Sequence, residues 1–324
     1  MTPTAVIIYY IDMDPRTRFD SENNGRLSGD LERASWLIDQ TAWSLCPLVP
    51  IPDSHTEQSI HKASHNTDTP DITAIEQLTR SWLINGRHTL IGFDHPHATF
   101  ATGVDSFIDS AVYRCSSVAS LPLTYYHVPD VAQQIGRPHS HMAMLFKAPQ
   151  DALCIIELPT PQHDIARVME HMALAKAAGH RVVVDMTFLP VATEKVQVDL
   201  SDVDEIWVSA NKVWNTGDLR PAWRFSREPI SDALTLAHRR TRYNLASLSA
   251  WNHIVTTYKY DTVVDQHLQT YRHICEVFNL TQTNNLLVAQ QEDIVWAPMY
   301  TDNWNYNNLI GTHNLIHTHG KHFW

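Results

Sequence analysis

The sequence predicts a three-layer α/β fold with a mostly parallel sheet, followed by a smaller α+β unit. Continuous apolar runs of four to seven residues recur along the chain, and such runs are typical of strands that helices cover on both faces. These runs alternate with stretches of helical periodicity, which favours right-handed crossovers between parallel strands. The chain has 324 residues and is 44% hydrophobic, which is enough for a core of this size.

The expected elements follow this alternation from residue 88 onwards, and helical stretches precede it. Helical periodicity over residues 29–44 precedes a polar, turn-rich stretch at 50–70, which we interpret as a surface loop. Asp71 or Thr73 can cap the next helix, and Gly179 can end the most regular amphipathic one. We expect helices at 71–83, 104–115 and 163–178, and strands at 88–93, 121–127, 152–158, 181–185, 205–209 and 220–226.

The pattern changes after residue 228. Two long helices are expected at 230–248 and 251–277, and short strand-like runs follow at 285–288, 294–298 and 308–310. We interpret residues 1–228 as a large domain, in which the first 85 residues are poorly placed, and residues 229–324 as a small C-terminal α+β domain.

Composition narrows the classes of function. The 24 Lys and Arg residues against 35 Asp and Glu residues give a formal net charge of −11, which argues against nucleic acid or an anionic membrane as a partner. No apolar stretch reaches the roughly 20 residues of a membrane helix, and the first apolar run does not resemble a signal peptide. The cysteines show no paired spacing, which favours reduced thiols in a cytoplasmic protein. They are Cys46, Cys115, Cys154 and Cys275.

Four side chains adjoin predicted strands. Asp185 ends one strand, Ser209 ends the next, Lys212 follows three residues later, and Arg220 opens another strand eight residues after the lysine. Open α/β sheets bind ligands at the carboxyl ends of their strands, so we expect these groups to meet. An amine for an aldehyde, a carboxylate for a pyridine nitrogen, and a hydroxyl and a guanidinium for a phosphate together suit pyridoxal 5′-phosphate (PLP).

Two further features can complete such a site. Thr102, Gly103 and Val104 form a turn and a helix start, whose backbone N–H groups can bind the same phosphate, although Gly103 could equally be a simple tight turn. Tyr125 and Tyr126 would alternate across a strand, so only one can face the cofactor ring, and we prefer Tyr125.

The run SANKVWNTGDLRPAW, from Ser209 to Trp223, resembles the Schiff-base signature of the class I/II aminotransferases, which are PLP-dependent enzymes of fold type I. The run VVVDMTF, which ends at Phe188, resembles that family's DxxY element. In the family's order, the resemblance covers residues 95–324. It implies that Lys212 forms the Schiff base, that Asp185 binds the pyridine nitrogen, and that the active site lies at the interface of a homodimer. It further implies that a second set contacts the cofactor: Ser209, Arg220, Thr102, Gly103, Val104, Tyr125 and Phe188.

Departures from the family pattern leave the reaction open. Leu158 or Glu157 stands in place of the asparagine of the family's NPTG turn, and Phe188 replaces the tyrosine that binds the ring hydroxyl. The chain stops at Trp324, before the strand that carries the family's carboxylate-binding arginine. The resemblance implies an aminotransferase-like enzyme acting on an amino acid or amine, and the departures favour specialised biosynthesis. A lyase, decarboxylase or cyclase on the same fold, or a non-catalytic binding protein, is an alternative.

Histidine pairs are spaced closely enough to reach a metal ion, as at His95 and His97 or at His139 and His141. No carboxylate or cysteine accompanies them in a recognisable ligand pattern, so we expect no metal site.

Overall fold

The computed structural model of the protein describes residues 54–66, 71–121, 125, 127–141, 152–160, 164–277, 280–290 and 309–311. The helix expected at 29–44, the strand expected at 294–298, Cys46 and Tyr126 lie outside these residues.

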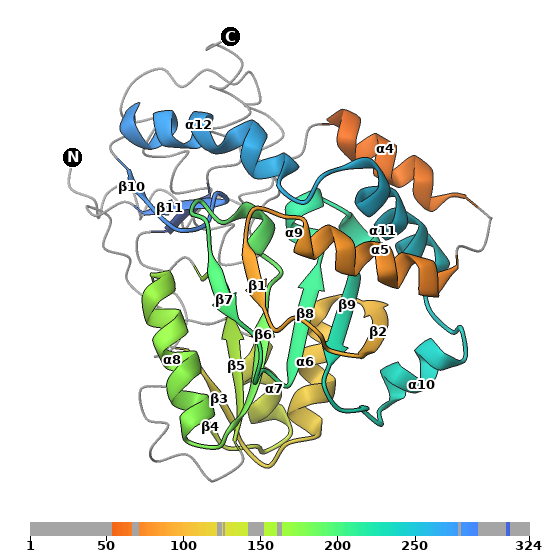
Figure 1. Ribbon diagram of the computed structural model, residues 1–324, viewed down its shortest axis with the longest axis vertical. Helices are drawn as coiled ribbons and strands as arrows, with labels where there is room; N and C mark the ends of the chain where they lie inside the picture. Colours follow the sequence, from red (N-terminus) through yellow and green to blue (C-terminus); the bar gives the residue numbers. More distant parts are fainter. Residues whose placement is uncertain are drawn as a thin grey trace, which may run out of the picture.

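A seven-stranded sheet forms the centre of the molecule, with the order β2-β9-β8-β6-β5-β3-β4 (Figure 1). Strand β9 is antiparallel to both of its neighbours, and the other neighbouring pairs are parallel. The expectation of a mostly parallel sheet is therefore confirmed. The strands are β2 His97–Thr102, β3 Val118–Ser120, β4 His139–His141, β5 Leu153–Glu157, β6 Arg181–Asp185, β8 Glu205–Ser209 and β9 Pro221–Ser226.

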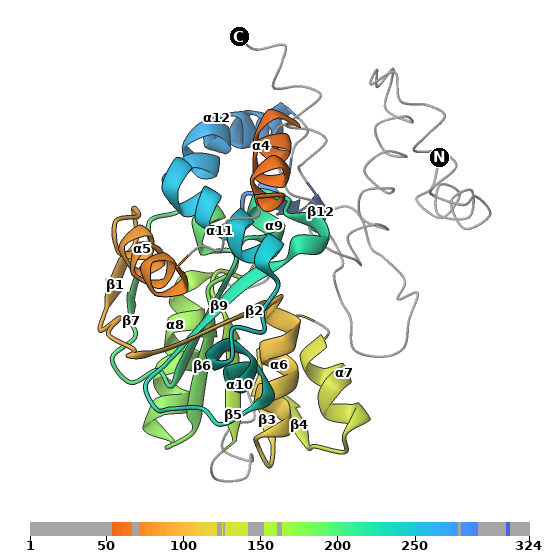
Figure 2. The same ribbon diagram turned by 90° about the vertical axis from the view of Figure 1, so that its right-hand side faces the viewer.

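Helices cover both faces of this sheet, as Figure 2 shows. Helices α6 (Val104–Tyr113) and α7 (His127–Gln134) pack on one face, and α8 (Ile165–Ala177) packs on the other. Successive residues of β5 divide between the two cores: Ile155 joins the cluster under α6, and Ile156 joins the cluster under α8. This alternation explains why the strand is apolar throughout.

Several expected elements are confirmed. Strands β6 and β8 have the expected bounds, and β5, α6 and α8 differ from expectation by one to two residues at their ends. Helix α5 (Ile72–Ile84) begins at Asp71, whose side chain accepts the Thr73 N–H at 2.9 Å. Gly179 follows α8 with a φ of 77°, the left-handed conformation that glycine adopts at a helix end.

Other elements differ from expectation. The stretch expected as a loop contains helix α4 (Ser54–Ser64), which packs on α11 (Leu245–Thr257) and buries Ile60 completely. The strand expected at 121–127 is wrong: β3 ends at Ser120, Tyr125 lies outside the strands, and His127 begins α7. The strand at this point is β3, which is made of small buried residues. The apolar run that follows β3 had suggested a strand in the wrong place.

The first strand of the main sheet, β2, was also missed. The strand expected at 88–93 shrinks to β1 (Thr89–Ile91), which pairs with β7 (Gln197–Asp199) in a separate two-stranded parallel sheet. Strand β2 instead lies directly before α6, separated from it by Gly103, and pairs with β9 over its whole length.

The two long helices expected after residue 228 are three shorter ones: α10 (Ala233–Arg239), α11, and α12 (Thr262–Val277). The first break falls at Thr241, which has a φ of 53°, and at Asn244, whose side chain caps α11 by accepting the Ser247 N–H. A three-stranded antiparallel sheet follows, made of β10 (Thr281–Gln282), β11 (Val288–Gln290) and β12 (Leu309–Gly311).

Candidate active site

The ends of five strands meet at one edge of the main sheet. Cross-strand pairs join Glu157 to Asp185, and Ser209 to Ala222. The same edge carries the pair between Thr102 of β2 and Pro221 of β9. It therefore gathers the carboxyl ends of β2, β5, β6 and β8 and the start of β9. This is the edge at which open α/β sheets bind ligands.

Lys212 lies directly beyond this edge, in the short helix α9 (Asn211–Trp214) that follows β8. The buried Ser209 hydroxyl fixes the connection: it donates to the Pro221 carbonyl at 3.2 Å and accepts the Asn211 N–H at 3.2 Å. The side chain of Lys212 is half-buried. Ser209 therefore links β8 to β9 and fixes the position at which the chain carrying Lys212 leaves the sheet.

Helix α4 holds the other end of α9. Asn215, which ends α9 with a φ of 48°, donates a side-chain hydrogen bond to Glu57 of α4. Ser59 of α4 in turn makes a 2.7 Å hydrogen bond to His253 of α11. Helix α4 belongs to the first 85 residues, whose place in the fold could not be predicted from the sequence. It supports α9, the helix that carries Lys212.

Asp185 is half-buried at the end of β6. One carboxylate oxygen accepts the Thr187 N–H at 2.9 Å and the Thr187 hydroxyl at 2.5 Å. Burial raises the pKa of Asp185 to about 6, the hydrogen bonds from Thr187 oppose the rise, and the negative charge of Asp105 adds to it. A carboxylate destabilised in this way gains from a nearby N–H⁺ group, which is what a protonated pyridine nitrogen provides.

Arg220 lies against the turn that starts α6. The Gly103 N–H donates to the Arg220 carbonyl at 2.5 Å. A Cβ added to Gly103 would stand 3.2 Å from Nε of Arg220, and the φ of 81° at this glycine is one that other residues rarely adopt. Arg220 itself has a φ of 42°. Two unusual backbone conformations therefore bring a guanidinium over a helix N-terminus, and this set of donors fits a phosphate.

The other residues of the turn have different environments. Thr102 is exposed, and its carbonyl accepts the Ser106 hydroxyl at 2.9 Å. Val104 is buried in the core under α6, so only its backbone can face a ligand. Asp105, which the sequence reasoning missed, forms an ion pair with Arg220. An acidic residue in the first turn of a helix is common because the helix dipole favours negative charge there, so no local pattern in the sequence indicated this pairing.

Tyr125 and Phe188 are less closely tied to the lysine. The Tyr125 N–H donates to the Glu157 carboxylate, which places this residue next to the end of β5. Phe188 is half-buried against the core cluster on the α8 side of the sheet. Asp185 is the cross-strand partner of Trp207, which belongs to the core on the α6 side of the sheet. Phe188 therefore packs on the opposite side of the sheet from Trp207. Glu157 was noted in the sequence only as a departure from the family turn, and its bond to Tyr125 was not foreseen.

Metal ligation and membrane insertion find no support in the described parts of the chain. No group of three or more His, Cys, Asp and Glu side chains there could hold a metal ion. Among the same residues, no helix is long and apolar enough to cross a membrane. Cys115, Cys154 and Cys275 are free thiols, and burial raises the pKa of each.

Comparisons with known proteins place the fold. No protein-family model and no curated protein matches the sequence. Among solved structures, an aminotransferase from Staphylococcus aureus is similar with a TM-score of 0.60 and 13% identity, over 85% of this chain and 90% of that one. N-succinyldiaminopimelate aminotransferase from Mycobacterium tuberculosis has a TM-score of 0.60 and 13% identity, over 87% and 95% of the two chains. A PLP-bound C-S lyase from Staphylococcus hominis has a TM-score of 0.53 and 12% identity, over 72% and 73%.

The chain therefore has the fold of the PLP-dependent aminotransferases, and the resemblance inferred from the sequence motifs is confirmed at the level of the fold. At identities of 12–13%, these comparisons show the fold alone. The cofactor, the reaction and the roles of single residues have to be argued from the residues of the site.

Proposed function

We propose that the protein is a PLP-dependent enzyme of the aminotransferase type, which acts on an amino acid or amine through Lys212. One observation carries the proposal: Lys212, Asp185, and the Ser209–Arg220–Gly103 group, chosen from the sequence for one cofactor, adjoin one edge of the sheet. That edge belongs to a fold shared with structures described as aminotransferases and as a PLP-bound lyase.

Each residue has a distinct task in this proposal. When bound, PLP supplies an aldehyde for amines and a ring that withdraws electrons from the substrate. The ε-amine of Lys212 would hold the aldehyde and, once released by the substrate's amine, move a proton to and from the substrate's α-carbon. Asp185 would keep the ring nitrogen protonated. Arg220, Ser209 and the backbone at Thr102, Gly103 and Val104 would bind the phosphate.

Asp105 modifies the phosphate site. Its carboxylate pairs with Arg220, so a phosphate dianion must share or displace that partner. The phosphate would gain the hydrogen bonds of the guanidinium and of the α6 N-terminus, while like charge would oppose Asp105. We therefore expect weaker retention of PLP than a site without this carboxylate would give.

A lyase reaction on the same site is the second candidate. The observation in its favour is the fold shared with the PLP-bound C-S lyase. We further propose a homodimer, which the motif resemblance implies, a cytoplasmic location, which the unpaired cysteine spacing favours, and a role in specialised biosynthesis, which the departures from the family pattern favour. The same resemblance places Tyr125 against the cofactor ring and Phe188 beside the ring oxygen.

Borohydride reduction tests the central proposal. The purified protein should turn yellow with added PLP, and reduction should fix the cofactor to the peptide that contains Lys212. The variant Lys212→Ala should lose the fixed label, while Lys195→Ala, which removes an exposed lysine from another loop, should keep it. A wild-type protein that ignores PLP, or a label spread over surface lysines, would overturn the proposal.

Product analysis separates the two reactions. An aminotransferase passes the substrate's amino group to an added keto acid, so one equivalent of a new amino acid forms for each substrate consumed. A lyase releases ammonia or carbon dioxide without needing a keto acid. Turnover across a panel of amino acids and amines, with and without 2-oxoglutarate or pyruvate, decides between them.

A further inference from the structure

We propose that Glu157, Asp109 and His127 are positioning residues that fix Tyr125 at the site edge, so that its ring can lie against a bound PLP ring. The inference rests on the function proposed above, and it adds three residues to which neither the sequence motifs nor the family resemblance gave a role at this ring.

The first support comes from the end of β5. Glu157 and Asp185 are paired neighbours on β5 and β6, so their side chains leave the same face of the sheet. The half-buried Glu157 carboxylate accepts the Tyr125 N–H. Partly burying a carboxylate costs free energy unless hydrogen bonds compensate it. Glu157 thereby ties Tyr125 to the strand end beside Asp185.

The second support comes from α6. Asp109 pairs with Nε2 of His127 at 2.8 Å, and the His127 ring lies 6.1 Å from the Tyr125 ring, centroid to centroid. Asp109 follows Asp105 by four residues, so both lie on one side of the helix. The helix that starts at the proposed phosphate site therefore also holds the segment that carries Tyr125.

A third contact secures the other side of the Tyr125 backbone. Its carbonyl accepts the N–H of Val128 at 3.1 Å, and Val128 is buried in the core under α6. Tyr125 is thus bound through its N–H to β5 and through its carbonyl to α7, while its side chain packs partly against that core. Both backbone polar groups of Tyr125 are therefore hydrogen-bonded, although Tyr125 itself lies outside the strands and helices.

Such anchoring has a chemical use. An aromatic ring that is already held in place stacks on a flat ligand without losing further conformational freedom. Weakening an anchor should lower PLP affinity only through Tyr125. The effect of the anchor variants should then disappear when Tyr125 itself is removed, which a double-mutant cycle measures.

The experiment compares PLP dissociation constants and the circular dichroism that the protein induces in the cofactor's visible band. Glu157→Ala, Asp109→Ala and Tyr125→Ala should each weaken binding by about 2- to 10-fold and change the induced signal. Glu157→Gln, which keeps an acceptor oxygen, should restore both. Glu76→Gln, which removes a carboxylate from the ion pair with Arg80 on α5, is the matched control and should match wild type.

The outcomes separate the two proposals. Anchor variants that weaken binding equally with and without Tyr125, or that match the Glu76→Gln control, overturn the positioning role and leave the PLP enzyme intact. A wild-type protein that binds no PLP overturns the proposed function and the role of Tyr125 with it. Faster amide hydrogen exchange at Tyr125 in Glu157→Ala than in Glu157→Gln, measured without cofactor, supports the anchor itself.

Discussion

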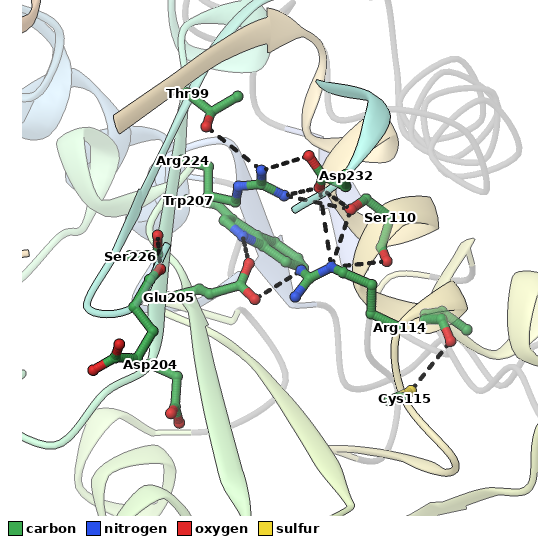
Figure 3. Close-up of polar contacts among 12 residues, drawn as sticks. Thr99, Ser110, Arg114, Cys115, Asp204, Glu205, Trp207, Arg224, Ser226 and Asp232 are labelled. Carbon is green, nitrogen blue, oxygen red and sulfur yellow. Dashed lines mark hydrogen bonds and ion pairs between the residues drawn. The ribbon is translucent and has the colours of Figure 1, made fainter. Parts of the chain in front are cut away.

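The two ends of helix α6 carry two groups of charged residues that are built differently. At its N-terminal end, Arg220 is 41% exposed at the side chain, has a φ of 42°, and forms an ion pair with Asp105. At its C-terminal end, Arg224 is fully buried and Asp232 is 9% exposed (Figure 3). The first group joins α6 to the start of β9, whereas the second joins α6 to both β8 and β9 and forms a closed network.

The closed network joins two ion pairs. Arg224 donates to both carboxylate oxygens of Asp232, at 2.7 and 3.1 Å, and to the Thr235 hydroxyl at 2.8 Å. Arg114, at the end of α6, donates to Glu205 at 2.8 Å, and Figure 3 shows that both arginines also reach Ser110 and Asp232. Among the described residues, Nε has no hydrogen-bond partner in either Arg224 or Arg220. The two arginines therefore differ in the bonds made by their terminal guanidinium nitrogens.

The pKa values of Asp232 and Asp185 are shifted in opposite directions. Burial would raise the pKa of Asp232, but hydrogen bonds from Arg224, Ser110 and the Thr235 N–H outweigh it, and the pKa falls well below its usual range. At Asp185 burial prevails, and the pKa rises to about 6. The network therefore stabilises the fold, while the site edge keeps a charge that the fold alone does not stabilise, which is typical of functional sites.

Arg224→Ala should have the largest effect. Removing Arg224 from this buried pair leaves Asp232 with the more distant cation of Arg114, at 4.0 Å, and loss of one partner of a buried pair costs about 3–5 kcal/mol. The midpoint of urea unfolding should fall accordingly, with an unchanged slope. Arg224→Met, which keeps an apolar side chain of similar length, should lose nearly as much, because Asp232 still loses its closest cation. A loss below about 1 kcal/mol, the scale of an exposed pair, would contradict the account of a closed network.

The same substitution at the two aspartates should have opposite signs. Because the pKa of Asp185 is raised from 3.8 to about 6, its charge destabilises the folded protein at pH 8, and this cost disappears below pH 3.8. Asp185→Asn should therefore stabilise the cofactor-free protein at pH 8, by about 1–3 kcal/mol. Its PLP-dependent activity should fall at the same time.

Asp232→Asn should destabilise the protein at pH 8, since the lowered pKa of Asp232 means that its charge stabilises the fold. That stabilisation is present above the unfolded pKa of 3.8 and is lost as the pH falls through the lowered folded value. Denaturant unfolding of both variants at pH 8 and pH 5 checks the signs. Two variants that shift stability in the same direction would show that the two environments do not differ as described.

The sequence allowed the site to be predicted better than the network. Asp185, Ser209 and Lys212 follow apolar strands whose bounds the residue pattern marks, so their meeting at one edge could be predicted from strand direction alone. Arg224 could not, because it lies within an apolar strand and its partner Asp232 stands in a connection that was expected to be helical. Pairing between β9 and its neighbours, which is set by long-range contacts, decides that arrangement.

Residues near Tyr125 show a second limit. The apolar run after β3 suggested a strand, but β3 is short and the next helix begins at His127. Backbone bonds of Tyr125 to Glu157 and Val128 replace strand pairing there. Such side-chain-to-backbone contacts depend on packing between distant segments, and no local pattern marks them.

Gly103→Ala should have an intermediate effect that falls on the site end of α6. A side chain there must adopt a φ of 81° and stand 3.2 Å from Nε of Arg220, which should cost about 1–2 kcal/mol of stability. PLP affinity should fall further, because the guanidinium is pushed from the helix N-terminus. Titration with PLP, beside unfolding of the same sample, measures both. Wild-type affinity in a destabilised protein would separate this turn from cofactor binding.

The partly buried surface pair between Glu76 and Arg80 sets the lower end of the scale. The two side chains lie four residues apart on α5 and are 25% and 22% exposed, with a separation of 2.8 Å. Solvent still reaches both side chains and partly screens this i,i+4 pair, so Glu76→Gln should change the free energy of unfolding by no more than about 0.5 kcal/mol. The change should vanish in 1 M salt, where the screening length is about 3 Å, whereas the loss in Arg224→Ala should persist. A Glu76→Gln effect as large and salt-resistant as that of Arg224→Ala would mean that burial is not what distinguishes the network at the end of α6.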